Sequence, residues 1–206
     1  MFAAGHLKIR ITEEDVSMKN IILASASPRR KELLEQIGVA FTVIPSKGAE
    51  TVTKTAPSDI VEELAQQKAE SVAAQVADGI IIGADTVVCQ DGKIMGKPKD
   101  HEDAHRMLQQ LQGEMHSVFT GVTLIVKENG EVKDRQTFSQ ETRVYVCAMT
   151  EEEIGQYIAS GEPMDKAGAY GIQGRFAAYV DSIEGDYNNV VGLPVSAVWQ
   201  ELKQYL

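Results

Sequence analysis

Arg29 and Arg30 form a pair of adjacent cations at the point where a helix is predicted to begin. Pro28 suits the first helical position, Ser27 before it is typical of a cap, and Gly38 marks the end. Because a helix N-terminus carries partial positive charge, each cation there costs about 0.3–1 kcal/mol. Backbone N–H groups and guanidinium groups that converge on one point suit a polyphosphate. Two solvated surface arginines are the alternative.

Asp85 and Thr86 interrupt the apolar segment IIIGADTVVC, which is predicted to be a buried strand. A carboxylate in such a segment is costly unless it is paired, hydrogen-bonded or bound to a metal. We therefore interpret Asp85 as a general base or a metal-associated carboxylate. A carboxylate that only holds a turn at the strand end is the alternative.

Four further polar residues indicate a functional site only if the fold brings them close together. Glu50 lies in a polar loop, Lys68 in a predicted helix and Lys97 before a proline, and each alone is typical of a solvated side chain. Gln173 lies in the glycine-rich segment EPMDKAGAYGIQG, which matches neither the P-loop nor the dinucleotide fingerprint. Its amide could pair with adjacent N–H and C=O groups on a pyrimidine edge, provided that neighbours lock its orientation.

The segment HEDAH at residues 101–105 matches the H-E-x-x-H pattern of zinc proteases. Its apolar partners, however, form one face of an amphipathic helix and leave both histidines near the polar border. Leu111 stands where a metzincin would place a third histidine. We therefore interpret this segment as an ordinary amphipathic helix.

The predicted elements that must position these residues are a mixture of helices and strands. Helices are predicted near residues 28–37, 58–78, 100–112, 150–160 and from Pro194 onward, and strands near 20–25, 40–45, 80–90, 115–127, 131–147, 176–183 and 188–192. Tight turns are expected at Asp91-Gly92 and Asn129-Gly130. This order favours an α/β fold with a mixed sheet.

Composition narrows the class of protein. The formal net charge of −10 argues against a general nucleic-acid-binding protein, which normally has a basic face. No apolar run approaches the roughly 18 residues that span a bilayer. Cys89 and Cys147 are too few for a disulfide framework, so we expect both to be core residues of a cytoplasmic protein. Residues 1–17 are interpreted as a leader or extension before a single two-lobed domain at 18–206.

The segments LASASPRRKELL, GADT, GKP and DKAGAYGIQG, in this order, together resemble the Maf family of nucleoside triphosphate pyrophosphatases. The resemblance implies hydrolysis between the α- and β-phosphates of a nucleotide, with a divalent metal cation, Mg²⁺ or Mn²⁺. It also implies an elongated, inosine triphosphatase-like fold with a central cleft, and frequent homodimers. The motif AYGIQG resembles the branch that acts on dTTP and UTP rather than on 7-methyl-GTP.

The resemblance also implies roles for individual residues. Asp85 is similar to the family's proton acceptor, and Arg29, Thr86 and Gln173 match positions tied to substrate choice. The remaining residues expected to bind substrate are Ser25, Arg30, Lys68 and Lys97, and the metal is expected at Glu50 and Asp85. A non-enzymatic nucleotide-binding regulator of septum formation and a broad phosphatase stay open as alternatives.

Overall fold

The computed structural model describes residues 20–206, so the extension predicted at residues 1–17 lies outside the described part of the chain. Its centre is a seven-stranded mixed sheet in the order β2-β1-β3-β5-β6-β7, with β4 paired to β3. The strands are β1 (Ile21–Leu23), β2 (Phe41–Val43), β3 (Gly79–Gln90), β4 (Lys93–Met95), β5 (Met115–Glu128), β6 (Glu131–Val146) and β7 (Val180–Glu184). Strand β1 is parallel to β2 and β3, and all other pairs are antiparallel. The predicted α/β mixed sheet is confirmed.

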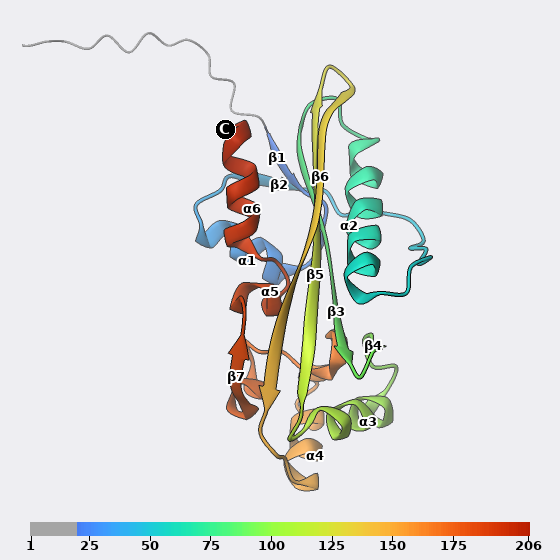
Figure 1. Ribbon diagram of the computed structural model, residues 1–206, viewed down its shortest axis with the longest axis vertical. Helices are drawn as coiled ribbons and strands as arrows, with labels where there is room; N and C mark the ends of the chain where they lie inside the picture. The colour runs from blue at the N-terminus through green and yellow to red at the C-terminus, as the bar shows by residue number, and fades with distance from the viewer. Residues whose placement is uncertain (1–19) are drawn as a thin grey trace, which may run out of the picture.

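The long strands β3, β5 and β6 run along the molecule and give it an elongated shape (Figure 1). Their connections contain the two predicted turns, at Asp91-Gly92 and Asn129-Gly130. All four turn residues have positive φ, from 49° at Asp91 to 80° at Gly130, as hairpins with twist-matched turns require. These turns fix the strand register and hence which side chains of each strand share a face.

Helices cover both faces and one end of the sheet (Figure 1). Helix α2 lies along one face, and α1, α5 and α6 lie on the other, while α3 and α4 lie at the lower end. The helices are α1 (Pro28–Gln36), α2 (Pro57–Ala73), α3 (His101–Leu111), α4 (Glu151–Ala159), α5 (Tyr187–Val191) and α6 (Val195–Leu202), with short 3₁₀ turns at η1 (Glu162–Asp165), η2 (Ala167–Ala169), η3 (Arg175–Tyr179) and η4 (Lys203–Tyr205). No helix of residues 20–206 is long and apolar enough to cross a membrane.

Helix α2 lies unusually close to the sheet because two strand positions have no side chain. A Cβ atom at Gly83 of β3 would lie 2.4 Å from the Ala65 carbonyl oxygen, and one at Gly121 of β5 would lie 2.3 Å from Val61. Contacts this short are impossible, so glycine is required at both positions. Buried apolar residues of α2, Ile60, Val61, Leu64, Ala65, Ala69, Val72 and Ala73, form the packing face.

Several local predictions are wrong, including the start of the strand expected at residues 176–183, because residues 176–179 belong to η3 and β7 begins at Val180. Residues 188–192 belong mostly to α5 rather than to a strand, because Asp186 caps the helix by accepting a hydrogen bond from the Asn188 N–H at 2.8 Å. Ser27 precedes α1 without a capping hydrogen bond from its side chain, and α2 spans Pro57–Ala73 rather than residues 58–78. Cys147 is exposed, whereas Cys89 is buried as predicted.

The segment HEDAH, which matches the zinc-protease pattern, lies in an amphipathic helix, as predicted. Asp100 caps α3 by accepting from the Asp103 N–H at 2.8 Å. The buried face of α3 consists of Ala104, Met107, Leu108 and Leu111. His105 faces outward and contacts Glu151 of α4 at 2.9 Å. This interaction links α3 to α4.

Candidate active site

A cavity of about 730 Å³ opens between the start of α1, strand β3, and the loop that connects α4 to η3. Its lining includes every residue predicted to bind substrate or to act in catalysis: Ser25, Arg29, Arg30, Lys68, Asp85, Thr86, Lys97 and Gln173. These residues come from five separate segments, so only the tertiary fold brings them together. Glu50, the further residue predicted for metal binding, is not part of the lining but contacts it through Lys68.

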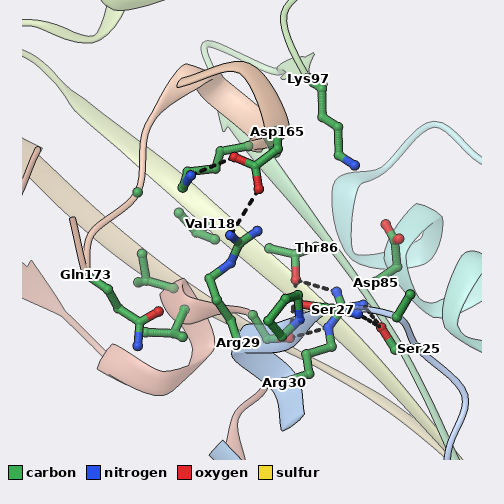
Figure 2. Close-up of a pocket in the computed structure, with 18 of the residues that line it drawn as sticks. Ser25, Ser27, Arg29, Arg30, Asp85, Thr86, Lys97, Val118, Asp165 and Gln173 are labelled. Atoms are coloured by element: carbon green, nitrogen blue, oxygen red, sulfur yellow. Dashed lines mark hydrogen bonds and ion pairs between the residues drawn. The ribbon is translucent and has the colours of Figure 1, made fainter. Parts of the chain in front are cut away.

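Arg30 is held in place by three hydrogen bonds, one from each guanidinium nitrogen (Figure 2). Its Nε donates to the Gly192 carbonyl oxygen at 2.8 Å, Nη1 to Ser25 Oγ at 3.2 Å and Nη2 to Thr86 Oγ1 at 3.1 Å. Burial lowers the pKa of Arg30 and the nearby Asp85 carboxylate opposes that shift, so the group stays charged. The remaining N–H bonds of Nη1 and Nη2 are available to an anion in the cavity.

Arg29 points across the cavity mouth toward the opposite wall (Figure 2). Its Nη1 donates to Asp165 Oδ2 at 3.3 Å, and Lys166 donates to the other oxygen of Asp165 at 2.6 Å. Burial alone would raise the pKa of Asp165, but the contacts with Lys166 and Arg29 outweigh burial and lower it. Arg29 therefore links the start of α1 to the glycine-rich loop through a half-exposed ion pair.

Lys68 of α2 lies between two carboxylates. It donates to Asp85 Oδ1 of β3 and lies 3.2 Å from Glu50 Oε1. The side chains of Lys68 and Asp85 are only 14% and 15% exposed, whereas that of Glu50 is 49% exposed. The costly strand carboxylate predicted from the sequence is therefore neutralised by a lysine that reaches it from the neighbouring helix.

A divalent metal would find hard oxygen ligands here but no complete cage. Within residues 20–206, no three His, Cys, Asp or Glu side chains gather closely enough to hold a metal ion. The two candidate carboxylates, Glu50 and Asp85, both contact the Lys68 ammonium group. This arrangement fits Mg²⁺ or Mn²⁺ only as an ion held by one or two carboxylates together with oxygens of a substrate.

Lys97 and Gln173 approach the cavity from opposite directions. Lys97 follows β4 and extends into the cavity from above, whereas Gln173 lies on the far side from Asp85 (Figure 2). The Gln173 amide makes no hydrogen bond to any other described residue. The neighbours that were expected to lock this amide are therefore not present, and the support acts on the backbone of its loop instead.

Glu162 supports that backbone, a role that no sequence pattern indicated. Its Oε1 accepts from the Tyr157 hydroxyl at 2.9 Å, and its Oε2 accepts from the Arg175 N–H at 3.0 Å. The Gly171 N–H donates to the same Tyr157 hydroxyl at 3.2 Å. A Cβ atom at Gly174 would lie 2.1 Å from Glu162 Oε1, so the close carboxylate also explains that glycine.

His116 and Tyr170 form a second, fully buried support below the glycine-rich loop. His116 Nε2 and the Tyr170 hydroxyl lie 2.8 Å apart, and the two rings meet edge to face at 5.2 Å. His116 is 1% exposed, and burial lowers its pKa to about 4. Its Nδ1 has no hydrogen-bond partner among the described residues. His116 is therefore neutral at physiological pH, and Tyr170 lines the cavity.

Two residues near the cavity that were not predicted, Thr120 and Glu162, differ in how clearly the sequence indicates them. Thr120 is a polar residue between Val118 and Val122 on the core face of β5, and such a break in an apolar alternation is visible in the sequence. Glu162 stands in a polar loop before Pro163 and has no such signal. Its role depends on contacts with Tyr157 of α4, 5 positions away, and with the Arg175 N–H, 13 positions away, which no local pattern predicts.

Known proteins of similar sequence share one description. A protein of Agathobacter rectalis described as a dTTP/UTP pyrophosphatase is 54% identical, over 91% of this chain and 98% of its own. A Bacillus cereus protein with the same description is 50% identical, over 96% of this chain and 95% of its own. The similarity therefore extends over nearly the whole length of each protein.

Solved structures of lower sequence similarity share the fold. The Staphylococcus aureus Ham1 protein superimposes with a TM-score of 0.53 at 14% identity, over 91% of this chain and all of its own. A HAM1 protein from Coxiella burnetii gives 0.51 at 16% identity, over 89% of this chain and all of its own. The predicted inosine triphosphatase-like architecture is confirmed at the level of the fold.

The family itself is identified by the sequence as a whole. Residues 20–205 match the profile of the family described as Maf-like protein. This match includes all the cavity residues named above, from Ser25 to Gln173. Together with relatives at 50–54% identity, it shows that the chain belongs to the Maf family.

Proposed function

We propose that this protein hydrolyses dTTP and UTP to the corresponding monophosphate and pyrophosphate. The observation that carries the proposal is the convergence of four cations, Arg29, Arg30, Lys68 and Lys97, with the carboxylate of Asp85 around one cavity. Relatives at 50–54% identity that are described as dTTP/UTP pyrophosphatases support the same reaction. The cations suit a triphosphate, and the carboxylate suits activation of water.

Binding of a triphosphate would explain why two arginines lie at the N-terminus of α1. Arg29 and Arg30 oppose the helix dipole in the free protein, but a triphosphate in the cavity interacts favourably with both the arginines and the backbone N–H groups. Arg30 presents a fork whose orientation is already fixed by Ser25, Thr86 and Gly192. Binding therefore does not require this side chain to be ordered.

Asp85 is the proposed general base. Its Oδ1 accepts from Lys68, while Oδ2 makes no hydrogen bond within residues 20–206 and can accept a proton from water. The water oxygen bonds to the α-phosphorus, the bond from that phosphorus to the bridging oxygen breaks, and pyrophosphate leaves with this oxygen. The water proton passes to Asp85. Lys68 and Lys97 offset the charge that develops on the leaving group.

We propose that Glu50 and Asp85 hold Mg²⁺ or Mn²⁺ together with phosphate oxygens of the substrate. The bound ion supplies charge neutralisation at the phosphates. The carboxylates are hard ligands of the kind these ions prefer, and Mg²⁺ sites commonly combine one or two carboxylates with substrate oxygens. Glu50 is half-exposed on a loop and could turn from Lys68 toward such an ion.

Base selection is assigned to Gln173. Its amide offers a donor and an acceptor, which match the adjacent carbonyl and N–H of a uracil or thymine edge. Cytosine presents a different order of donors and acceptors. The separation of Gln173 from Asp85 across the cavity is consistent with a base at one end and phosphates at the other (Figure 2). Cytoplasmic location and a homodimer stay predictions that accompany this function.

One product assay tests the proposal. The protein is incubated with Mg²⁺ and each of dTTP, UTP, CTP, GTP, 7-methyl-GTP and pseudouridine triphosphate, and pyrophosphate is separated from inorganic phosphate. We expect pyrophosphate from dTTP and UTP. Release of inorganic phosphate would indicate a broad phosphatase instead. Binding of dTTP without any turnover would indicate the non-enzymatic regulator.

A further inference from the structure

We propose that Thr120 is a positioning residue that fixes Arg30 for phosphate binding by acting through Thr86. Thr120 lies on β5 directly opposite Thr86 of β3. It is fully buried and does not line the cavity, so it cannot touch a substrate. The inference rests on the proposed function to the extent that it assigns the cavity to a phosphate ligand.

A chain of hydrogen bonds connects Arg30 to the protein interior. Arg30 Nη2 donates to Thr86 Oγ1 at 3.1 Å, and Thr86 Oγ1 lies 2.9 Å from Thr120 Oγ1. Thr120 in turn donates to the Asn189 carbonyl oxygen at 2.9 Å. Asn189 is itself fixed, because its side-chain amide donates to the Val118 carbonyl and to Thr142, each at 3.0 Å.

The two ends of this chain determine the direction of every proton in it. A carbonyl oxygen only accepts, so the single hydroxyl proton of Thr120 points to Asn189. Thr120 Oγ1 must then accept the proton of Thr86, and Thr86 Oγ1 presents only lone pairs on its other side. A guanidinium group only donates, so this orientation of Thr86 matches Arg30 Nη2.

Loss of the Thr120 hydroxyl would disturb two of the three anchors of Arg30. The nearest other acceptor for the Thr86 proton is the Gly192 carbonyl oxygen at 3.5 Å. That oxygen already accepts from Arg30 Nε at 2.8 Å. Thr86 would therefore turn away from its orientation toward Nη2 and compete with Arg30 for Gly192. The guanidinium fork would lose the geometry that the cavity provides before a ligand arrives.

Strand β5 also contains a matched control for Thr120. Thr123 of the same strand is also fully buried, and its hydroxyl lies 2.9 Å from that of Thr137 on β6. It does not line the cavity. Thr123→Val therefore removes an equivalent buried hydroxyl pair from the same sheet without contact with Arg30. It controls for any general effect on the stability of the sheet.

The test compares Thr120→Val, Thr120→Ser and Thr123→Val in the full chain. Calorimetric binding of inorganic pyrophosphate is measured for each, together with kcat and KM for dTTP. We expect Thr120→Val to weaken pyrophosphate binding and to raise KM by about tenfold, with kcat within about twofold of wild type. Thr120→Ser, which keeps the hydroxyl, should restore both values to within about twofold. Thr120→Ala serves in place of Thr120→Val if the latter does not fold.

A double-mutant cycle with Thr86→Val separates a route through Thr86 from a general loss of packing. If Thr120 acts through Thr86, the double variant should bind pyrophosphate no more weakly than Thr86→Val alone. Additive losses, or equal effects of Thr120→Val and Thr123→Val, would overturn the inference. So would failure of the wild-type protein to bind pyrophosphate.

The two proposals can fail separately. A wild-type protein that binds pyrophosphate but hydrolyses neither dTTP nor UTP would contradict the proposed function. In that case, weaker binding in Thr120→Val together with recovery in Thr120→Ser would still support the positioning role. If the wild-type protein hydrolyses dTTP and UTP but Thr120→Val binds pyrophosphate as tightly as wild type, the proposed function is supported and the positioning role of Thr120 is contradicted.

Discussion

Lys68 donates a hydrogen bond to Asp85, and this pair joins helix α2 to strand β3 at the inner wall of the cavity. Both side chains are largely withdrawn from solvent, with 14% and 15% exposed. A buried ion pair is a weak source of stability, because desolvation offsets most of the attraction. Its placement beside the arginines that we propose to bind phosphate is better explained by function.

Asp85→Asn should lower the rate of pyrophosphate release by about 10²–10⁴-fold, because an amide cannot take the proton of the attacking water. The amide oxygen can still accept from Lys68, and Lys68 keeps its contact with Glu50, so the fold should persist. Circular dichroism and thermal melting check the fold. Asp134→Asn, at an exposed carboxylate that contacts Tyr205, is the control and should retain activity. Full activity in folded Asp85→Asn would remove Asp85 from the mechanism.

Glu50→Gln should raise the Mg²⁺ concentration for half-maximal activity by about tenfold or more, because a charged oxygen ligand is replaced by a neutral one. At saturating Mg²⁺, kcat should stay within about twofold of wild type. The measurement is a Mg²⁺ titration at fixed dTTP. Glu63→Gln is the matched control, since Glu63 accepts hydrogen bonds from Thr53 in the same region and does not line the cavity. An unchanged titration in Glu50→Gln would show that Glu50 does not bind the metal.

Gln173→Ala should reduce the preference for dTTP over CTP by roughly tenfold while leaving kcat for dTTP closer to wild type. The physical reason is that Gln173 lies across the cavity from Asp85 and contributes to recognition rather than to chemistry (Figure 2). The measurement is kcat/KM for both nucleotides. Gln156→Ala, on the exposed side of α4, is the control. The same nucleotide preference in Gln173→Ala and wild type would contradict this assignment.

Gly174→Ala should destabilise the protein by about 1–3 kcal/mol, because the new methyl group would push the Glu162 carboxylate away from the Tyr157 hydroxyl and the Arg175 N–H. The displaced loop carries Gln173, so nucleotide preference should weaken as well. Chemical denaturation and the dTTP:CTP ratio are the two readouts. Gly155→Ala, in the interior of α4 with open space around the new Cβ, should instead stabilise by about 0.5–1 kcal/mol. If both substitutions behave alike, Glu162 does not support the loop as described.

The buried His116 predicts a pH-dependent stability. Burial lowers its pKa from the ordinary 6.5 to about 4, so between these values the unfolded chain binds a proton that the folded protein does not. Stability should therefore fall as pH decreases, by about 2 kcal/mol between pH 7 and pH 5. His116→Phe should lack this part of the decrease, as measured by denaturation at both pH values.

Tyr170→Phe is the control for the His116 prediction. It removes the hydroxyl partner of His116 but keeps the histidine buried, and burial is the cause of the lowered pKa. The variant should be less stable than wild type at both pH values yet keep the same decrease between them. A decrease that disappears in Tyr170→Phe would assign the effect to the hydrogen bond instead.

Much of the fold could be predicted from hydrophobic periodicity and turn residues. The long strands, the turns at Asp91-Gly92 and Asn129-Gly130, and the helices from Pro28 and after Pro57 follow from these local signals. The segment at 188–192 was mispredicted because β-branched valines favour a strand, whereas the cap at Asp186 favours a helix. The capping hydrogen bond to Asp186 outweighed the strand propensity of the valines in this segment.

Some residues of the candidate site could likewise be predicted from the sequence, and others could not. Asp85 could be found because a carboxylate interrupts an apolar strand, and Arg29 and Arg30 because they oppose a helix dipole. The pairing of Asp85 with Lys68 could not, since it depends on how α2 lies on the sheet. Glu162 was missed because its contacts with Tyr157 of α4 and with the Arg175 N–H depend on how the intervening irregular loop folds back.

The glycines at 83 and 121 determine how rigidly helix α2 is held against the sheet beside the cavity. Because they let backbone meet backbone, the height of Lys68 above Asp85 is set by two main chains rather than by compressible side chains. Gly121 is also the direct cross-strand neighbour of Asp85. A single methyl group at either glycine would act as a wedge that lifts the helix from the sheet. Such a change would separate Lys68 from Asp85 without altering any residue that lines the cavity.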